Sequence, residues 1–187
     1  MAENKNTEEE KKFIAETATA LASDREEKVI AKLNELKLKG KPSILPLILD
    51  LLNSSKSEKV KQEVIFLISN LKDQNCVPYI IKYIQQNQGH TMISQVIAAC
   101  WQSRLIYSKY LNTFIRCFVS GDYQVALESF TVIEEMLWQS DSKSISECKK
   151  ILVSEIENIN SEKMPLYNEL IKVLDEGRSK LYDDYSD

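Results

Sequence analysis

The residues that most often build catalytic or metal centres are few and scattered in this chain. It has one histidine, His90, directly after Gly89. Its four cysteines lie far apart in the sequence: Cys76, Cys100, Cys117 and Cys148. A zinc site needs ligands at short spacings, and there is no Cys-x-x-Cys pair. Free cysteine is among the most buried residue types, so we predict reduced thiols in helix cores, no metal site, and a turn or cap role for His90.

Other catalytic patterns are also absent from the sequence. There is no glycine-rich phosphate loop, no Ser-His-Asp order and no nucleophile elbow. Adjacent carboxylates occur at Glu134-Glu135 and Asp183-Asp184. Neighbouring residues of a helix do not face each other, so we interpret both pairs as solvated charge. We expect no catalytic residue and no cofactor, and we interpret the chain as a protein without enzymatic activity.

A binding function is indicated by the stretch from Gln74 to Gly121, which has no aspartate or glutamate in a chain of net charge −4. Basic and aromatic side chains gather there: Lys82, His90, Arg104, Lys109, Arg116, Tyr79, Tyr83, Trp101, Tyr107 and Tyr110. This combination suits an acidic peptide, a phosphorylated segment or a nucleic-acid backbone. We select Trp101, Arg104 and Arg116 as candidate partner-binding residues. In the alternative interpretation the tyrosines are core residues and the Lys and Arg charges point in different directions.

A repeat of 32 to 34 residues must position these side chains. Ser43-Ile-Leu-Pro46 opens one unit and Asn75-Cys-Val-Pro78 opens the next. In each, a predicted N-cap residue precedes a proline in the first helical turn, where the N–H groups have no helical partner anyway. The apolar stripes match at the same offset, and a third unit follows with some drift in its spacing.

The first two units resemble the HEAT family, through the leading proline, the Ile/Leu stripe and the second helix that opens Lys59-Val-Lys-Gln-Glu-Val. The resemblance covers 42–137. It implies an all-α fold, a right-handed α-α superhelix (α-solenoid) of about ten helices in antiparallel pairs, used as a binding scaffold or adaptor. The family motif is structural and carries no catalytic residue. The second unit departs from the pattern where Gly89-His90-Thr91-Met92 replaces the usual helix start.

Trp101 is the sharpest single candidate. It aligns with Ser69 of the preceding unit, a position outside the core set of its helix. In HEAT-like folds the second helix of each pair lines the concave face, so the resemblance implies that Trp101 stands in a groove. The alternative is a core tryptophan with a satisfied indole N–H. We interpret Trp138, at a helix end beside a polar loop, as a packing lid.

We predict a single domain over 1–187. It comprises a capping helix pair in 1–41, three repeats in 42–137, and a C-terminal helix pair with an acidic tail in 138–187. Residues 1–6 are expected to be disordered, Thr7 and Glu10 to form a capping box, and Ser144 to open a capped helix. The glycines are expected at helix ends, and the prolines at helix starts. These are Gly40, Gly89, Gly121 and Gly177, and Pro42, Pro46, Pro78 and Pro165.

The polar start of the chain predicts no signal peptide, and no apolar run approaches the ~20 residues that span a bilayer. We therefore expect a cytoplasmic protein. Three functions remain open: a scaffold that binds a protein partner, a nucleic-acid-binding protein like the HEAT-like DNA glycosylases, and a HEAT-like lyase or regulatory subunit. The negative net charge argues against nucleic acid. An acidic or phosphorylated peptide is the partner that the acid-free stretch favours.

The repeat register makes a first prediction. Leu49, Leu67, Ile68 and Ile81 occupy matching positions on the apolar stripes, so each should be core. Substitution of any one by Ala is expected to lower the free energy of unfolding by about 2–5 kcal/mol, measured by urea denaturation. Losses below about 1 kcal/mol at most of these positions would show that the register is wrong.

Overall fold

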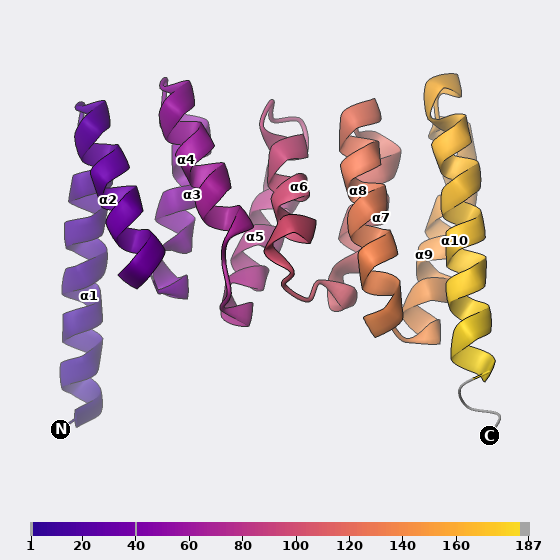
Figure 1. Cartoon of the computed structure of the whole chain (residues 1–187), viewed down its shortest axis with the longest axis horizontal. Coiled ribbons are helices and arrows are strands. Elements are labelled where there is room, and N and C mark those ends of the chain that lie inside the picture. The colour runs from indigo at the N-terminus through magenta and orange to yellow at the C-terminus, as the bar shows by residue number, and fades with distance from the viewer. Residues whose placement is uncertain (1, 40, 184–187) are drawn as a thin grey trace. The chain divides into compact units, whose positions relative to one another are not determined.

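The computed structural model describes residues 2–39 and 41–183, and the side chains of residues 8–37 and 41–176. The described chain is helical and contains no strand, which confirms the predicted all-α class. None of its helices is both long and apolar enough to cross a bilayer. Its ten α-helices (Figure 1) are α1 Ala2–Leu21, α2 Glu26–Lys39, α3 Leu45–Ser54, α4 Glu58–Ser69, α5 Val77–Gln86, α6 Ile93–Ser103, α7 Leu111–Ser120, α8 Tyr123–Met136, α9 Ser142–Ser154 and α10 Met164–Asp183.

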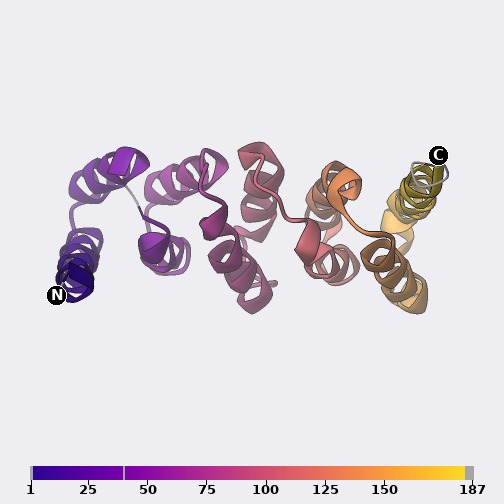
Figure 2. The same cartoon turned by 90° about the horizontal axis from the view of Figure 1, so that it is seen from below.

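The chain divides into two compact units, Met1–Tyr83 and Ile84–Asp187, with the boundary inside α5. In unit 1, α1 and α3 pack together, α2 and α4 pack together, and each first helix packs against the helix that follows it. In unit 2, α7 and α9 form one layer, and α6, α8 and α10 form the other. Figure 2 shows the two layers of each unit nearly end-on. Each unit is therefore a two-layer stack of helix pairs.

The four residues predicted to be core are buried, as expected. Leu49, Leu67, Ile68 and Ile81 are each at most 5% exposed. In unit 2 the interior is aromatic: Phe114 is fully buried, and the ring of Tyr107 meets it edge-on at 5.8 Å between ring centroids. Edge-to-face contact of this kind adds to the free energy gained by burying the rings.

The predicted helix ends are partly wrong. Short 3₁₀ turns precede α3 and α5, so the capping residues lie further upstream than the repeat pattern suggests. Lys41, not Ser43, precedes the first of these turns, and the hydroxyl of Ser43 instead donates to Glu10 of α1. Asp73, not Asn75, caps the second turn, by accepting from the N–H of Asn75.

The terminal helices are longer than predicted. α1 begins at Ala2, so 2–6 are helical, and Thr7 lies inside the helix instead of capping it. α10 continues past Gly177 to Asp183, and α9 is capped by Asp141, whose carboxylate accepts from the N–H of Ser144. That hydrogen bond lowers the pKa of the Asp141 carboxyl. Gly40 and the acidic end at 184–187 lie outside the described residues.

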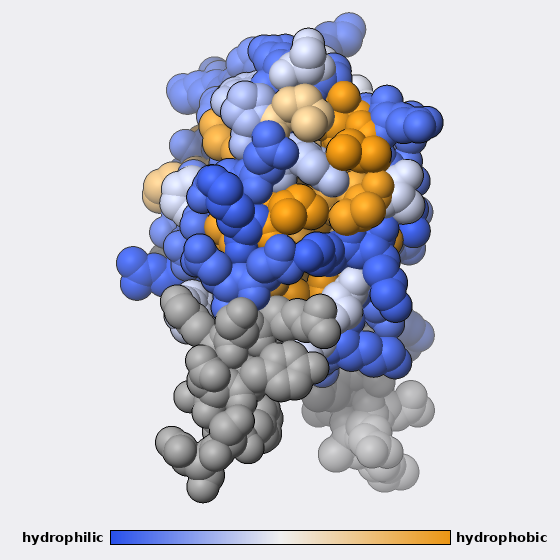
Figure 3. Space-filling view, turned by 90° about the vertical axis from the view of Figure 1, so that its right-hand side faces the viewer, coloured by the Kyte–Doolittle hydropathy of each residue, from blue (hydrophilic) through white to orange (hydrophobic). Residues whose placement is uncertain are grey.

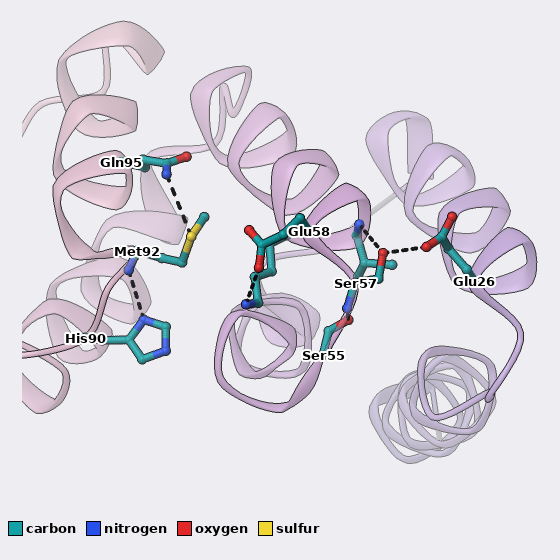
Figure 4. A network of polar contacts seen from close by, with 9 residues as sticks. Glu26, Ser55, Ser57, Glu58, His90, Met92 and Gln95 are labelled. Atoms are coloured by element: carbon teal, nitrogen blue, oxygen red, sulfur yellow. Dashed lines mark hydrogen bonds and ion pairs between the residues drawn. The ribbon is translucent and has the colours of Figure 1, made fainter.

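Polar contacts join the helices of unit 1 at their ends. Ser57 caps α4 by accepting from the N–H of Val60, and its hydroxyl donates to Glu26 at the start of α2 (Figure 4). Lys37 of α2 donates to Glu63 of α4 at 2.7 Å and lies 4.4 Å from the centroid of the Phe66 ring. Both ends of α2 are therefore joined to α4, one at the start of α4 and the other near its middle.

The corner between α7 and α8 depends on Gly121. Its backbone is extended (φ −80°, ψ 173°), so a left-handed conformation is not the reason for glycine. A Cβ at this position would overlap the side chain of Val125 and lie 2.8 Å from the carbonyl oxygen of Cys117. Glycine therefore lets the first turn of α8 approach the last turn of α7.

A buried lysine completes this corner. Lys163 is 2% exposed, and its ammonium donates to the carbonyl oxygens of Phe118, Val119 and Gly121 at 3.1, 2.7 and 2.9 Å. These carbonyls lie at or just beyond the C-terminus of α7, where the helix leaves carbonyls without helical partners and its dipole favours a cation. Burial lowers the pKa of Lys163, and Asp122 opposes that shift.

The face of unit 2 formed by α9 and α10 carries apolar side chains at the surface (Figure 3). Two of the exposed apolar residues in this part of the chain are Val153 of α9, 50% exposed, and Ile156, 43% exposed. Polar side chains surround the apolar area in this view. The last helix pair thus leaves part of its apolar surface uncovered.

Gly121→Ala is expected to destabilise the chain by about 1–3 kcal/mol, because the methyl group overpacks the corner. Gly89→Ala is the matched control: no atom lies within 4 Å of a Cβ there, so its effect should stay within about 0.5 kcal/mol. Urea unfolding of both variants measures the difference. Equal effects would contradict the close-approach explanation.

Lys163→Met should lower the free energy of unfolding by about 1.5–3 kcal/mol, because it removes a charged donor from three carbonyls. Lys172→Met is the control, since the Lys172 side chain is exposed and, among the described side chains, its ion pair is with Glu169 on its own helix. Thermal and urea unfolding report the loss. A Lys163→Met variant as stable as wild type would show that solvent satisfies these carbonyls.

Candidate functional site

Trp101 lies at the surface of α6, with 36% of its area exposed, and is not a core tryptophan. Its indole N–H donates to Oε2 of Glu128 at 3.0 Å, and Glu128 lies on α8, the neighbouring helix of the same layer. The other oxygen of Glu128 accepts from Gln124 at 2.7 Å. The indole ring is therefore oriented by the Glu128 carboxylate, which is in turn hydrogen-bonded to Gln124 of its own helix.

Arg104 ends the helix that carries Trp101. It is the C-cap of α6 and adopts the left-handed conformation (φ 60°, ψ 22°), the one described non-glycine residue with positive φ. Its N–H donates to the carbonyl of Trp101 at 3.4 Å. The side chain is exposed, so a solvent-accessible guanidinium follows the indole by three residues in sequence. Non-glycine residues adopt this conformation at some energetic cost.

Arg116 is exposed, but it lies on α7, in the other layer of unit 2. Trp101 and Arg104 belong to the layer of α6 and α8. The structure thus brings together two of the three candidate residues and adds Glu128, which was not predicted. Two other basic residues of the acid-free stretch also lie outside α6: Lys82 belongs to unit 1, and Lys109 lies in the turn before α7.

The acid-free stretch does not produce an acid-free surface. α6 has no charged residue, and its neighbour α8 has Glu128, Glu134 and Glu135 and no Lys or Arg. Because α8 packs beside α6, the carboxylates of the surface near Trp101 come from residues after Gly121. The sequence did contain a sign of this acidic surface: Glu128 and Glu135 are two helical turns apart, so they lie on the same side of the helix.

The remaining aromatic predictions have mixed outcomes. Tyr83 and Tyr107 are buried, as the alternative interpretation expected, whereas Tyr79 and Tyr110 are half-buried. The prediction that Trp138 is a packing lid is wrong, because 70% of its side chain is exposed. It lies in a 3₁₀ turn after α8, where the chain turns away before α9 begins.

The prediction for His90 is confirmed: its Nδ1 accepts from the N–H of Met92 at the start of α6 (Figure 4). The four cysteines are free and buried, also as predicted. Burial raises the pKa of Cys76 to about 11 and those of Cys100, Cys117 and Cys148 to about 12, so all four are thiols at neutral pH. Within the described residues, no three His, Cys, Asp or Glu side chains are grouped to hold a metal ion.

Two of the cavities in the described part of the chain lie in unit 1. One, of about 240 Å³, is lined mostly by apolar residues, with Lys37, Lys41 and Lys72 among the polar ones. The other, of about 820 Å³, is lined by residues from the ends of α1 to α4. Several of their polar groups already serve as caps or ion pairs, such as Lys37 with Glu63. Neither cavity contains a candidate residue from the sequence.

No protein-family model, no curated protein and no solved structure matches the chain.

Proposed function

We propose that this chain is a non-enzymatic protein-binding scaffold, a short HEAT-like α-solenoid that holds a segment of a partner protein on its layer of second helices. In unit 2 that layer consists of α6, α8 and α10. The two-layer packing of helix pairs and the repeat register support the solenoid proposal. In this architecture each pair contacts mainly its neighbours and the stack offers an extended surface.

The observation that carries the proposal is the exposed and oriented Trp101. Large aromatic residues in partly desolvated positions are typical energetic anchors of protein interfaces. An indole already held by Glu128 loses little conformational entropy when a partner covers it, and such preorganisation raises affinity. Trp101 also stands beside the exposed Arg104, so an apolar anchor and polar groups of both signs lie together.

Nucleic acid is the less favoured partner. A nucleic-acid surface derives its affinity from clustered Lys and Arg that contact phosphates. Here α6 and α8 contain neither residue, and Glu128 lies against the principal aromatic side chain. An activity as a lyase or a regulatory subunit for a cofactor has no specific support from the described cavities.

A photo-crosslinking amino acid at Gln102, an exposed neighbour of Trp101, tests this proposal in the native cell. Protein adducts are expected, and Trp101→Ala should weaken binding of the identified partner at least tenfold, or ~1.4 kcal/mol. Trp138→Ala removes another exposed tryptophan and should leave the affinity unchanged. Adducts to nucleic acid, or equal adducts from the Trp101→Ala protein, would contradict the proposal.

A further inference from the structure

We infer that the Trp101 surface receives a basic side chain, an arginine of a partner segment, whose guanidinium stacks on the indole and pairs with Glu128. This inference rests on the proposed function and specifies the chemistry of the partner at the same surface. It differs from the acidic or phosphorylated partner that the acid-free stretch of sequence favours.

The first argument is the charge of the layer. α6 is uncharged up to Arg104 at its C-cap, and α8 has three glutamates and no Lys or Arg. α10 has four acidic residues and three basic ones, Lys172, Arg178 and Lys180. Among the described residues, Glu128, Glu134 and Glu135 form no ion pair with a Lys, an Arg or the histidine. The layer therefore has an excess of carboxylates, which favours approach of a cationic segment.

The second argument is the hydrogen-bonding state of Glu128. Each of its oxygens accepts one hydrogen bond, from Trp101 and from Gln124, and a carboxylate has about four acceptor positions. Both oxygens therefore retain capacity for another donor. A guanidinium presents paired N–H groups in a planar fork that matches a carboxylate, which an ammonium does not.

The third argument is the position of the indole next to that carboxylate. Tryptophan is the best aromatic partner for a cation above its ring, and arginine is the commonest such cation. Because the indole N–H is occupied by Glu128, the exposed part of Trp101 offers an incoming group its π-system and no free donor. An anionic group would meet both that π-system and the carboxylate unfavourably.

Glu135 extends the surface in the direction of α8. It follows Glu128 by seven residues, two helical turns, so both lie on the same side of the helix, about 10 Å apart along the axis. An extended segment with basic residues three positions apart spans that distance. The fit is to a short basic segment with an arginine at the Trp101 position.

Selection from a random peptide library, displayed on phage and screened at about 0.15 M ionic strength, tests the inference with a defined probe. The full chain is the target, and the Trp101→Ala protein is used for counter-selection. Peptides that require Trp101 are expected to be enriched in arginine. Binding of the selected peptides is then measured by fluorescence anisotropy with two charge-neutralising variants next to Trp101.

Glu128→Gln keeps an acceptor for the indole N–H and removes the charge, so it should weaken the peptides at least tenfold. Arg104→Gln removes a positive charge that repels an incoming arginine, so it should strengthen their binding instead of weakening it. Trp101-dependent peptides that are acidic, or that lose affinity with Arg104→Gln and not with Glu128→Gln, would overturn the inference and leave the scaffold proposal intact. Selected peptides that bind Trp101→Ala as well as wild type would overturn both.

Discussion

The arrangement of unit 2 depends on the ammonium of Lys163 buried at the C-terminus of α7. It comes from the turn before α10 and bonds three carbonyls of the α7–α8 corner, one of them Gly121. Burying a charge is costly unless its donors are satisfied, so these three carbonyls must stay where they are for the corner to persist. The next residue, Asp122, caps α8 through the N–H of Val125. The ammonium thus joins α7, the start of α8 and the start of α10 in one polar centre.

This polar centre lies where α8 begins, and the start of α8 decides which of its side chains face Trp101. Once α8 starts at Tyr123, its helical period decides that Glu128 lies within hydrogen-bonding distance of the indole on α6. A shift of one residue in the start of α8 would rotate its side chains by about 100° and move that carboxylate away. The glycine at 121 makes the tight start possible, and the lysine stabilises it. The position of Glu128 beside Trp101 therefore depends on where α8 begins, next to the corner that Lys163 closes.

Much of the fold was predictable because buried apolar residues recur at regular spacing along each helix and from one helix pair to the next. Leu49 and Ile81 lie on matching stripes of adjacent pairs, and the free energy of burying them depends on local spacing that a single sequence shows. Helix ends were less predictable. Asp73 lies two residues before the residue expected to cap, because a 3₁₀ turn adds a short step that the repeat pattern does not contain. Helix α1 begins before the expected capping box at Thr7, because a capping sequence within a polar segment does not by itself determine where a helix begins.

In a stacked helical chain, a continuous stretch of sequence does not predict the composition of a surface. A surface in such a chain is built from alternate helices, so its composition is that of every second segment. The acid-free run that includes Trp101 ends at Gly121, and α8, which begins two residues later, lies beside α6 and contributes glutamates alone among charged residues. Arg116, although inside the run, is on the other layer. Glu128, which is distant in sequence, bonds the indole directly, and electrostatic complementarity at an interface acts through space. For that reason a cationic group is the better match to this surface.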